Sequence, residues 1–516
     1  MKGTFLVGID LGVSLIKVGI YDVNGNRIET VIKDSPGHCP KPGIFEQSGN
    51  EFLKTVIDAL NESMIKSQIN PSSVEAIAFS GQMGGAIGVD RNWEAVTCWS
   101  NPLDTRYTPY IDKMLLSKKD QILKLSGTNF PYFAPKILWW KNEFPDLYKN
   151  SSKFMFLSGF IAGKMGNIGI ENAYVDRTYL EMSGIADIPN NNWSSELCNE
   201  FGIDISKLPR ILNSTSVIGK LDKSIADVCG LKDGIPLVAG AGDKPAGYLG
   251  AGMVEPGLLI DEAASFATFS ICVDEYIPDI KFKTLENIPS PIPGNYFPTV
   301  ILVGSGATHK WFRDTFGNEE KRVEAESMKS AYEILDEKAK SINPGSDKLL
   351  SIGLLGGRAN PSDPDIRGMW IGFSWGHKKE HFYRSLLESF AYEYAYTAKV
   401  MRENYPNLKF DEIRVIGGGA VSDFWNQIKC DIIGIPYIKL NRNDFALLGD
   451  IIIAGNAIGI FDDLGKTAKK FSKKTKEYLP NKKIHEYYKN YVNLYEGLFE
   501  RVRELYVDLK NIPDFD

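Results

Sequence analysis

Residues 9–22, IDLGVSLIKVGIYD, form two apolar runs separated by a turn of small residues. A second stretch at 260–273 reads IDEAASFATFSICV and aligns with the first without a gap, so that Asp10 falls on Asp261. Each half of the chain is therefore predicted to begin with a strand, a short turn and a returning strand. We interpret this repeat as two similar α/β domains that face each other across a cleft, where ligands preferentially bind.

After each hairpin, helical and strand-like segments alternate, which is typical of α/β proteins. The predicted elements are a helix at 51–66, strands at 74–82, 348–355 and 413–419, and a long helix at 381–404. We place the two domains at 1–252 and 253–516.

Composition excludes several classes of function. The chain has 516 residues, 43% hydrophobic and 24% charged, and a net charge of −6, which gives no general attraction to nucleic acid or anionic membranes. The six cysteines include no CxxC pair, which favours a reducing compartment and argues against structural zinc. We see no signal peptide and no membrane span, and expect a cytoplasmic protein. The lysine-rich run 466–483 is interpreted as a solvated helical face.

Four small-residue turns could bring backbone N–H groups close to phosphate oxygens. They are GIDLGVS at 8–14, GAGDKPAG at 240–247, VGSGATHKW at 303–311 and IGGGAVSDFW at 416–425. None is a Walker loop or a dinucleotide fingerprint. Because the turns are spread over both halves, they suggest a nucleoside triphosphate held between the domains.

The stretch at 238–252, VAGAGDKPAGYLGAG, places a single carboxylate, Asp243, among glycines and alanines. Two interpretations stay open. Asp243 could simply cap the following helix, since Asp favours N-cap positions. Alternatively, the small residues leave room for a ligand to approach the carboxylate.

The chain resembles the FGGY family of carbohydrate kinases almost end to end. The matching motifs include GIDLGVSLIKVGIYDVNG at 8–25, SGQMGGAIGVD at 80–90, DTR at 104–106, GAGDKPAGYLGAG at 240–252, RGMWIGFSWGHKKEHFYRSLLE at 367–388 and VIGGGAVSDFWNQIKCDIIGIP at 415–436. The resemblance implies two actin-like, ribonuclease-H-like ATPase domains on either side of a catalytic cleft. It also implies ATP and Mg²⁺ as the cofactors and a small-molecule sugar as the substrate.

The resemblance also assigns roles to individual residues. Asp243 matches the general base, with small neighbours that would admit a sugar hydroxyl and the γ-phosphate, and Asp10 matches the carboxylate that positions Mg²⁺. The residues matched to substrate binding are Gln82, Met83, Gly84, Asp104, Arg106 and Asp243. The residues matched to ATP binding are Asp10, Gly12, Ser14, Lys17, Ser265, Gly306, Gly418, Gly419, Ala420 and Asp423. The alternatives are a strand-end carboxylate at Asp10, a surface ion pair between Asp104 and Arg106, and glycines needed for packing.

Three departures from the family pattern leave the substrate open. Many members read GTSG where this chain has Ala264-Ser265-Phe266. Pentulose kinases have a histidine after Gln-Met, whereas Gln82-Met83 is followed by Gly84 here, and Trp99 lies several residues early.

We expect an ATP-dependent sugar kinase that phosphorylates a small ketose, with D-xylulose as the first candidate because of the GQM and GAGD-x-PAG contexts. The alternatives are a kinase for ribulose, gluconate, glycerol or a signalling pentose derivative, and a regulator that binds sugar or nucleotide but has lost turnover. No nucleic-acid or membrane partner is expected, and a homodimer stays open.

Overall fold

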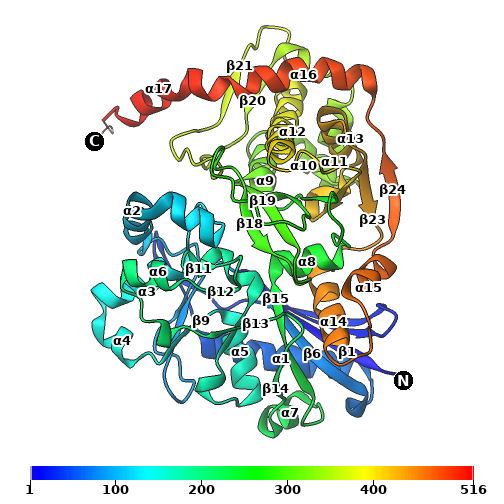
Figure 1. Ribbon diagram of the computed structural model, residues 1–516. Helices are drawn as coiled ribbons and strands as arrows, with labels where there is room; N and C mark the ends of the chain where they lie inside the picture. The colour runs from blue at the N-terminus through cyan, green and yellow to red at the C-terminus, as the bar shows by residue number, and fades with distance from the viewer. Residues whose placement is uncertain (1–2, 514, 516) are drawn as a thin grey trace.

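The structure, a computed structural model, describes residues 3–513 and residue 515. Each half of the chain contributes one large mixed sheet, and the two sheets form the two lobes in Figure 1. The first has the order β14-β15-β6-β1-β2-β3, with β1 Phe5–Leu11, β2 Leu15–Asp22, β3 Arg27–Asp34, β6 Val74–Gly81, β14 Val217–Lys220 and β15 Pro236–Gly242. The second has the order β18-β19-β17-β16-β22-β23-β24, with β16 Leu259–Glu262, β17 Ala267–Ile271, β18 Glu286–Pro289, β19 Tyr296–Leu302, β22 Ile413–Ile416, β23 Tyr437–Leu440 and β24 Lys474–Tyr478.

The same five-strand pattern occurs in both sheets, which confirms the repeat predicted from the two hairpins. In each sheet the first strand pairs on one side with the returning strand of its hairpin, and that strand pairs with a third, also antiparallel. On its other side lie two further strands, parallel to the first. The predicted strand at 348–355 is only partly right. It forms β20 (Leu350–Ile352), which pairs with β21 (Met369–Ile371) in a separate small sheet, because helices intervene before the second sheet continues at β22.

Two helices lie at the junction of the lobes in Figure 1, α8 (Asp243–Gly250) and α14 (Phe445–Ala457). They pack against each other, and α14 also packs on β1 and β6 of the first sheet. A Cβ on Gly250 would lie 2.0 Å from Phe445 O, and one on Gly449 would lie 2.0 Å from Ala246 O. These glycines therefore set how closely the two helices cross.

The remaining helices cover the sheets. In the first lobe they are α1 Gly49–Ser67, α2 Thr108–Ser126, α3 Phe133–Glu143, α4 Pro145–Asn150, α5 Leu157–Gly166, α6 Ser195–Phe201 and α7 Lys223–Cys229. In the second half they are α9 Ser305–Phe316, α10 Asn318–Glu326, α11 Ala331–Ala339, α12 Lys379–Asn404, α13 Asp423–Ile433, α15 Leu464–Phe471, α16 Lys482–Glu496 and α17 Leu498–Lys510. No helix of the described residues is both long and apolar enough to cross a membrane.

The lysine-rich run at 466–483 is not one helical face as predicted. It covers most of α15, the exposed edge strand β24 and the start of α16. Lysines on an edge strand discourage pairing with another chain, which accounts for the charge without a ligand.

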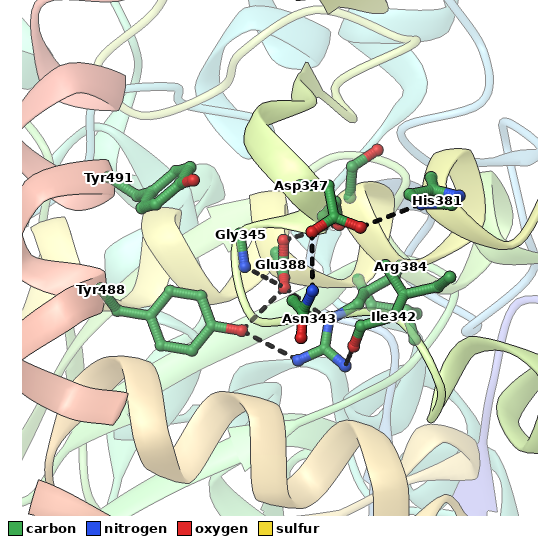
Figure 2. A network of polar contacts seen from close by, with 12 residues as sticks. Ile342, Asn343, Gly345, Asp347, His381, Arg384, Glu388, Tyr488 and Tyr491 are labelled. Atoms are coloured by element: carbon green, nitrogen blue, oxygen red, sulfur yellow. Dashed lines mark hydrogen bonds and ion pairs between the residues drawn. The ribbon is translucent and has the colours of Figure 1, made fainter. Parts of the chain in front are cut away.

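Figure 2 shows how α16, the first of the two helices at the end of the chain, is fixed to the second lobe. The buried Glu388 of α12 accepts hydrogen bonds from Tyr488 Oη (2.7 Å), Arg384 Nε (2.8 Å) and Gly345 N (3.0 Å). Gly345 begins a run of four residues with left-handed φ angles, 345–348, a conformation that costs about 1–2 kcal/mol for each non-glycine residue. The RGMWIGFSWGHKKEHFYRSLLE motif thus ends in a carboxylate that ties a strained turn and the tail to the core.

Candidate active site

The carboxyl ends of β1, β6 and β15 lie side by side and bring three predicted site residues together. Leu11 pairs with Gly81, and Gly81 pairs with Gly242, so one row of the sheet runs through all three. Asp10 precedes this row on β1, while Gln82 and Asp243 follow it directly on the other two strands. Ligands of open α/β sheets bind at such carboxyl ends.

Two oxygen atoms at this edge are buried without a hydrogen-bond partner among the described residues, Asp10 Oδ1 and Gln82 Oε1. The other Asp10 oxygen accepts a bond from Lys17 Nζ at 3.0 Å. The amide nitrogen of Gln82 donates to Gln47 Oε1 at 3.2 Å. Buried acceptors without donors are costly, so both atoms suit a ligand that brings hydrogens or positive charge.

Charges from both lobes surround Asp243. Burial raises the pKa of Asp243 to about 6; Lys244 opposes this shift, and the negative charges of Asp10 and Glu262 add to it. The pKa of Lys17 is raised mainly by Asp10, with smaller contributions from Asp243 and Glu262. Asp10, Lys17 and Asp243 are therefore brought together as predicted.

Lys244 and Glu262 are charged residues of this site that the sequence prediction missed. Lys244 Nζ donates to Glu262 Oε2 at 2.7 Å, which joins the start of α8 to the end of β16 in the other lobe. In the sequence, only their positions could have indicated a place in the site: Lys244 follows Asp243 directly, and Glu262 follows the aligned Asp261.

Asp243 is not the cap of α8. Gly242 occupies the N-cap position, and Asp243 is the first helical residue, where Oδ1 accepts the N–H of Lys244 at 2.8 Å. This is the only hydrogen bond that the Asp243 side chain makes with the described residues. Its second oxygen is thus available to a ligand.

Most glycines around Asp243 serve packing, which corrects the expectation that they make room for substrate. Gly240 has φ +77°, and a Cβ there would lie 1.7 Å from Phe79 O on β6. A Cβ on Gly242 would lie 2.6 Å from Met83 Sδ, and Gly250 contacts α14 as described above. Gly247 alone of this set has nothing within 4 Å of such a Cβ.

Asp104 and Arg106 form an ion pair in which the carboxylate is buried and the guanidinium is partly exposed. Asp104 is fully buried and accepts bonds from Arg106 Nε at 2.9 Å and from Arg106 N at 3.2 Å. The Arg106 guanidinium lies over the Trp139 ring, 4.8 Å from its centroid, and also reaches Glu46 at 2.7 Å. The pair fixes the loop that carries it.

That loop also fills the place where pentulose kinases carry a histidine. A Cβ on Gly84 would lie 2.7 Å from Pro102 Cγ, and one on Gly85 would lie 2.1 Å from Trp99. The backbone of Gly84 accepts a bond from the fully buried Lys136 at 3.3 Å. Burial holds the pKa of Lys136 well below its usual range, against the charge of Asp104. Lys136 is a third polar residue that the sequence prediction missed.

A cavity of about 770 Å³ lies in the second lobe, where the turns at 303–311 and 416–425 meet the hairpin turn at 263–267. Gly306 N donates to Ala264 O at 3.0 Å, and Gly419 N donates to Ala263 O at 2.8 Å. Of the residues predicted to bind ATP, those lining this cavity are Ser265, Gly306, Gly418, Gly419 and Asp423. Those not lining it are Ala420, beside it, and Asp10, Gly12, Ser14 and Lys17 on the hairpin of the first lobe.

Family models match both halves of the chain. The N-terminal domain of the FGGY family of carbohydrate kinases matches residues 5–250, and its C-terminal domain matches residues 286–458. The chain belongs to the FGGY family. It is therefore an ATP-dependent carbohydrate kinase with the actin-like ATPase fold.

The relatives of this FGGY kinase are similar over their whole length. The xylulose kinase of Bacillus subtilis is 25% identical, with 98% of this chain and 99% of the relative covered. The autoinducer-2 kinase of an Enterobacter species is also 25% identical, with 99% and 96% covered. Among solved structures, the ligand-bound xylulose kinase from Lactobacillus acidophilus has a TM-score of 0.89 and 22% identity, with 98% of this chain and 100% of that chain covered. This last likeness shows the fold alone.

Besides Lys17, Gly306 and Gly419, two further residues predicted to bind ATP in this FGGY kinase already have hydrogen-bond partners within the protein. Lys476 Nζ donates to Asp423 at 2.6 Å; burial raises the pKa of Asp423, but bonds from Lys476 and Tyr478 outweigh it and bring the pKa to about 2. Gly12 N closes its own turn by donating to Leu15 O at 3.0 Å. Gly418, by contrast, has open space around it, and Ser265 is exposed.

The described residues contain no group of three or more His, Cys, Asp or Glu side chains placed to hold a metal. Mg²⁺ usually keeps several waters and uses one or two carboxylates together with substrate phosphates. The unpartnered Asp10 Oδ1 fits that requirement.

Proposed function

We propose that this kinase transfers the γ-phosphoryl group of ATP to a hydroxyl of a small ketose, with D-xylulose as the first candidate and Asp243 as the general base. The observation that carries the proposal is Asp243 itself, which has one free oxygen, a pKa raised to about 6 and a place between the two lobes. A base with this pKa is ionised at neutral pH and still accepts a proton readily.

In the reaction, Asp243 accepts the proton of the sugar hydroxyl while that oxygen forms a bond to the γ-phosphorus. The bond from the γ-phosphorus to the bridging oxygen breaks, and ADP carries away the electron pair. Lys17 and Lys244 place positive charge beside the transferred group and its acceptor. Asp10 would hold Mg²⁺, which supplies charge neutralisation at the phosphates when it is bound.

The sugar would lie against the carboxyl ends of β6 and β15, near Gln82 and Gly84. The ATP phosphates would lie between the hairpin of the first lobe and the turns at Ser265 and Gly306. The base would occupy the 770 Å³ cavity beside Gly418 and Gly419. Phosphate-binding turns and a separate cavity for the base agree with this division.

One observation favours a substrate other than xylulose. Pro102 occupies the space that a side chain at position 84 would need, so no imidazole can contact the sugar there. A site without that hydrogen-bonding group discriminates differently among hydroxylated ligands. A polyol or a signalling pentose derivative, the class to which the autoinducer-2 kinase relative points, is therefore the second candidate.

A coupled ADP-release assay over D-xylulose, D-ribulose, gluconate, glycerol and a phosphorylatable autoinducer-2 precursor decides among these functions. The proposal expects the highest kcat/KM for xylulose. A higher value for another compound identifies that compound as the substrate and overturns the xylulose assignment. Saturable sugar binding by calorimetry with no ADP release from any compound would instead indicate a regulator that has lost turnover.

A further inference from the structure

A directed chain of hydrogen bonds runs along one wall of the nucleotide cavity. His309 Nε2 on α9 lies 2.5 Å from Tyr383 Oη, and Tyr383 Oη donates to Asp336 Oδ1 at 2.8 Å. Ser422 Oγ donates to the other Asp336 oxygen at 2.6 Å. Tyr383 and Asp336 are buried, whereas His309 and Asp336 both line the cavity.

Counting hydrogens along this chain fixes the tautomer of His309. A carboxylate only accepts, so Tyr383 gives its single hydrogen to Asp336. The Tyr383 oxygen can then only accept, and the hydrogen between the rings must belong to His309 Nε2. Burial, with the positive charges of Arg313 and Lys429, lowers the pKa of His309 to about 3. His309 is therefore neutral, and its Nδ1 carries a lone pair.

That lone pair has no partner among the described residues, and the ring lies at the aromatic end of the cavity. The His309 ring is 4.4 Å from the Tyr332 centroid and 5.5 Å from that of Trp425. Along α9 it is three residues, a rise of about 4.5 Å, beyond Gly306, which contacts the turn at Ala264. The turns at Ser265 and Gly306 suit the phosphates, so the aromatic end, which Gly419 adjoins at Trp425, suits the base.

We propose that His309 Nδ1 accepts a hydrogen bond from the exocyclic 6-amino group of the ATP base and thereby selects adenine over 6-oxo purines. This inference rests on the proposed nucleotide site. In ITP the same position carries an oxygen, which is also an acceptor. The lone pairs of that oxygen and of His309 Nδ1 would then face each other without a hydrogen between them. A site built to accept a hydrogen bond rejects an analogue that cannot donate one.

The test compares kcat/KM for ATP and ITP at saturating sugar in the full-length enzyme. We expect about a 5- to 150-fold preference for ATP in the wild type, the range that corresponds to leaving one acceptor unpaired when the nucleotide binds. His309→Leu removes the acceptor and should bring the ATP:ITP ratio close to one with the sugar KM unchanged. Tyr383→Phe keeps the imidazole but removes the acceptor that holds its hydrogen on Nε2, so it should also lower the ATP:ITP ratio. If Tyr383 had only a structural role, this substitution would leave the ratio unchanged.

An unchanged ATP:ITP ratio in either variant, with melting temperatures near that of the wild type, overturns the proposal. His309→Leu could instead change the preference for ATP over 2′-deoxyATP and leave the ATP:ITP ratio unchanged. That result also overturns the proposal, and it identifies the ribose as the group that bonds to the Nδ1 lone pair. Gly418→Leu separates this inference from the site itself, because Gly418 lines the cavity and has open space around it. A raised ATP KM in Gly418→Leu supports the proposed nucleotide site, whatever the result for His309. An unchanged ATP KM refutes both the proposed nucleotide site and the role of His309.

Discussion

The two hairpins that begin the two halves align residue by residue, yet their aspartates lie in opposite surroundings. Asp10 is cross-strand partner to Lys17 and faces the junction of the lobes. Like Asp261, it has one oxygen without a hydrogen-bond partner among the described residues. Asp261 is fully buried and bonds to the equally buried Lys429 of α13. Its neighbour Glu262 faces the junction in its place and bonds to Lys244.

The turns of the two hairpins differ in length by one residue. The first hairpin closes with residues 12–15 between the paired Leu11 and Ile16, whereas the second has 263–267 between Glu262 and Thr268. Because side chains alternate along a strand, a shift of one residue moves each side chain to the other face of the sheet. The gap-free alignment identifies both hairpins but matches Asp10 to Asp261, whereas Glu262 is the carboxylate that bonds to Lys244 at the junction.

The comparison predicts that carboxylates at the junction govern the rate and that Asp261 governs stability. The largest effect on the rate is expected for Asp243→Asn, which keeps the size of the side chain and removes the proton acceptor. Steady-state kinetics should show kcat lower by about 10²–10⁴-fold with KM for sugar and ATP nearly unchanged. A variant that phosphorylates sugar at close to the wild-type rate would show that Asp243 is not the base.

Asp261→Asn should do the reverse. Removing one partner of a buried ion pair leaves Lys429 charged without a counter-ion and costs roughly 3–5 kcal/mol of unfolding free energy. Denaturant unfolding measures this loss. At a temperature where the variant is folded, kcat should stay within about twofold of wild type, because sites that are not in contact influence each other by no more than that. The double variant Asp261→Leu/Lys429→Met is the control and should recover most of the stability.

Asp10→Asn and Glu262→Gln probe the two carboxylates that face the junction. Each should lower kcat/KM by about 10–100-fold, the usual cost of losing a group that positions reacting charges. Neither should reduce stability as much as Asp261→Asn. For Asp10→Asn we also expect a higher Mg²⁺ concentration at half-maximal activity, measured by titration. If Glu262→Gln behaves like Asp261→Asn, the exchange of faces is refuted.

The smallest effect concerns pH. Asp243 must be ionised to accept a proton, and its pKa is raised to about 6, so kcat/KM should fall about tenfold for each pH unit below 6. The charge of Asp10 contributes to that rise, so Asp10→Asn should move this acidic limb to lower pH, whereas Asp261→Asn should leave it in place. If the acidic limb of the kcat/KM profile does not move in Asp10→Asn, the charge of Asp10 does not influence the pKa of Asp243.

Much of this arrangement follows from local pattern. Apolar runs with small-residue turns identified both hairpins, the parallel strands after them and the strand ends where Asp10, Gln82 and Asp243 meet. Such features depend on neighbours in the chain and on side-chain periodicity, which a single sequence contains. The same reasoning identified the turns around the nucleotide cavity.

The sequence by itself determined the family, the repeated α/β fold and the residues at the strand ends. The tertiary structure alone decided which face each carboxylate takes, that Glu262 joins Lys244 across the lobes, and that Pro102 fills the space beside Gly84. It also decided that the glycines around Asp243 mostly serve close packing against β6 and α14. These outcomes depend on register and on contacts between residues far apart in the chain, and both are set by packing and not by the local pattern.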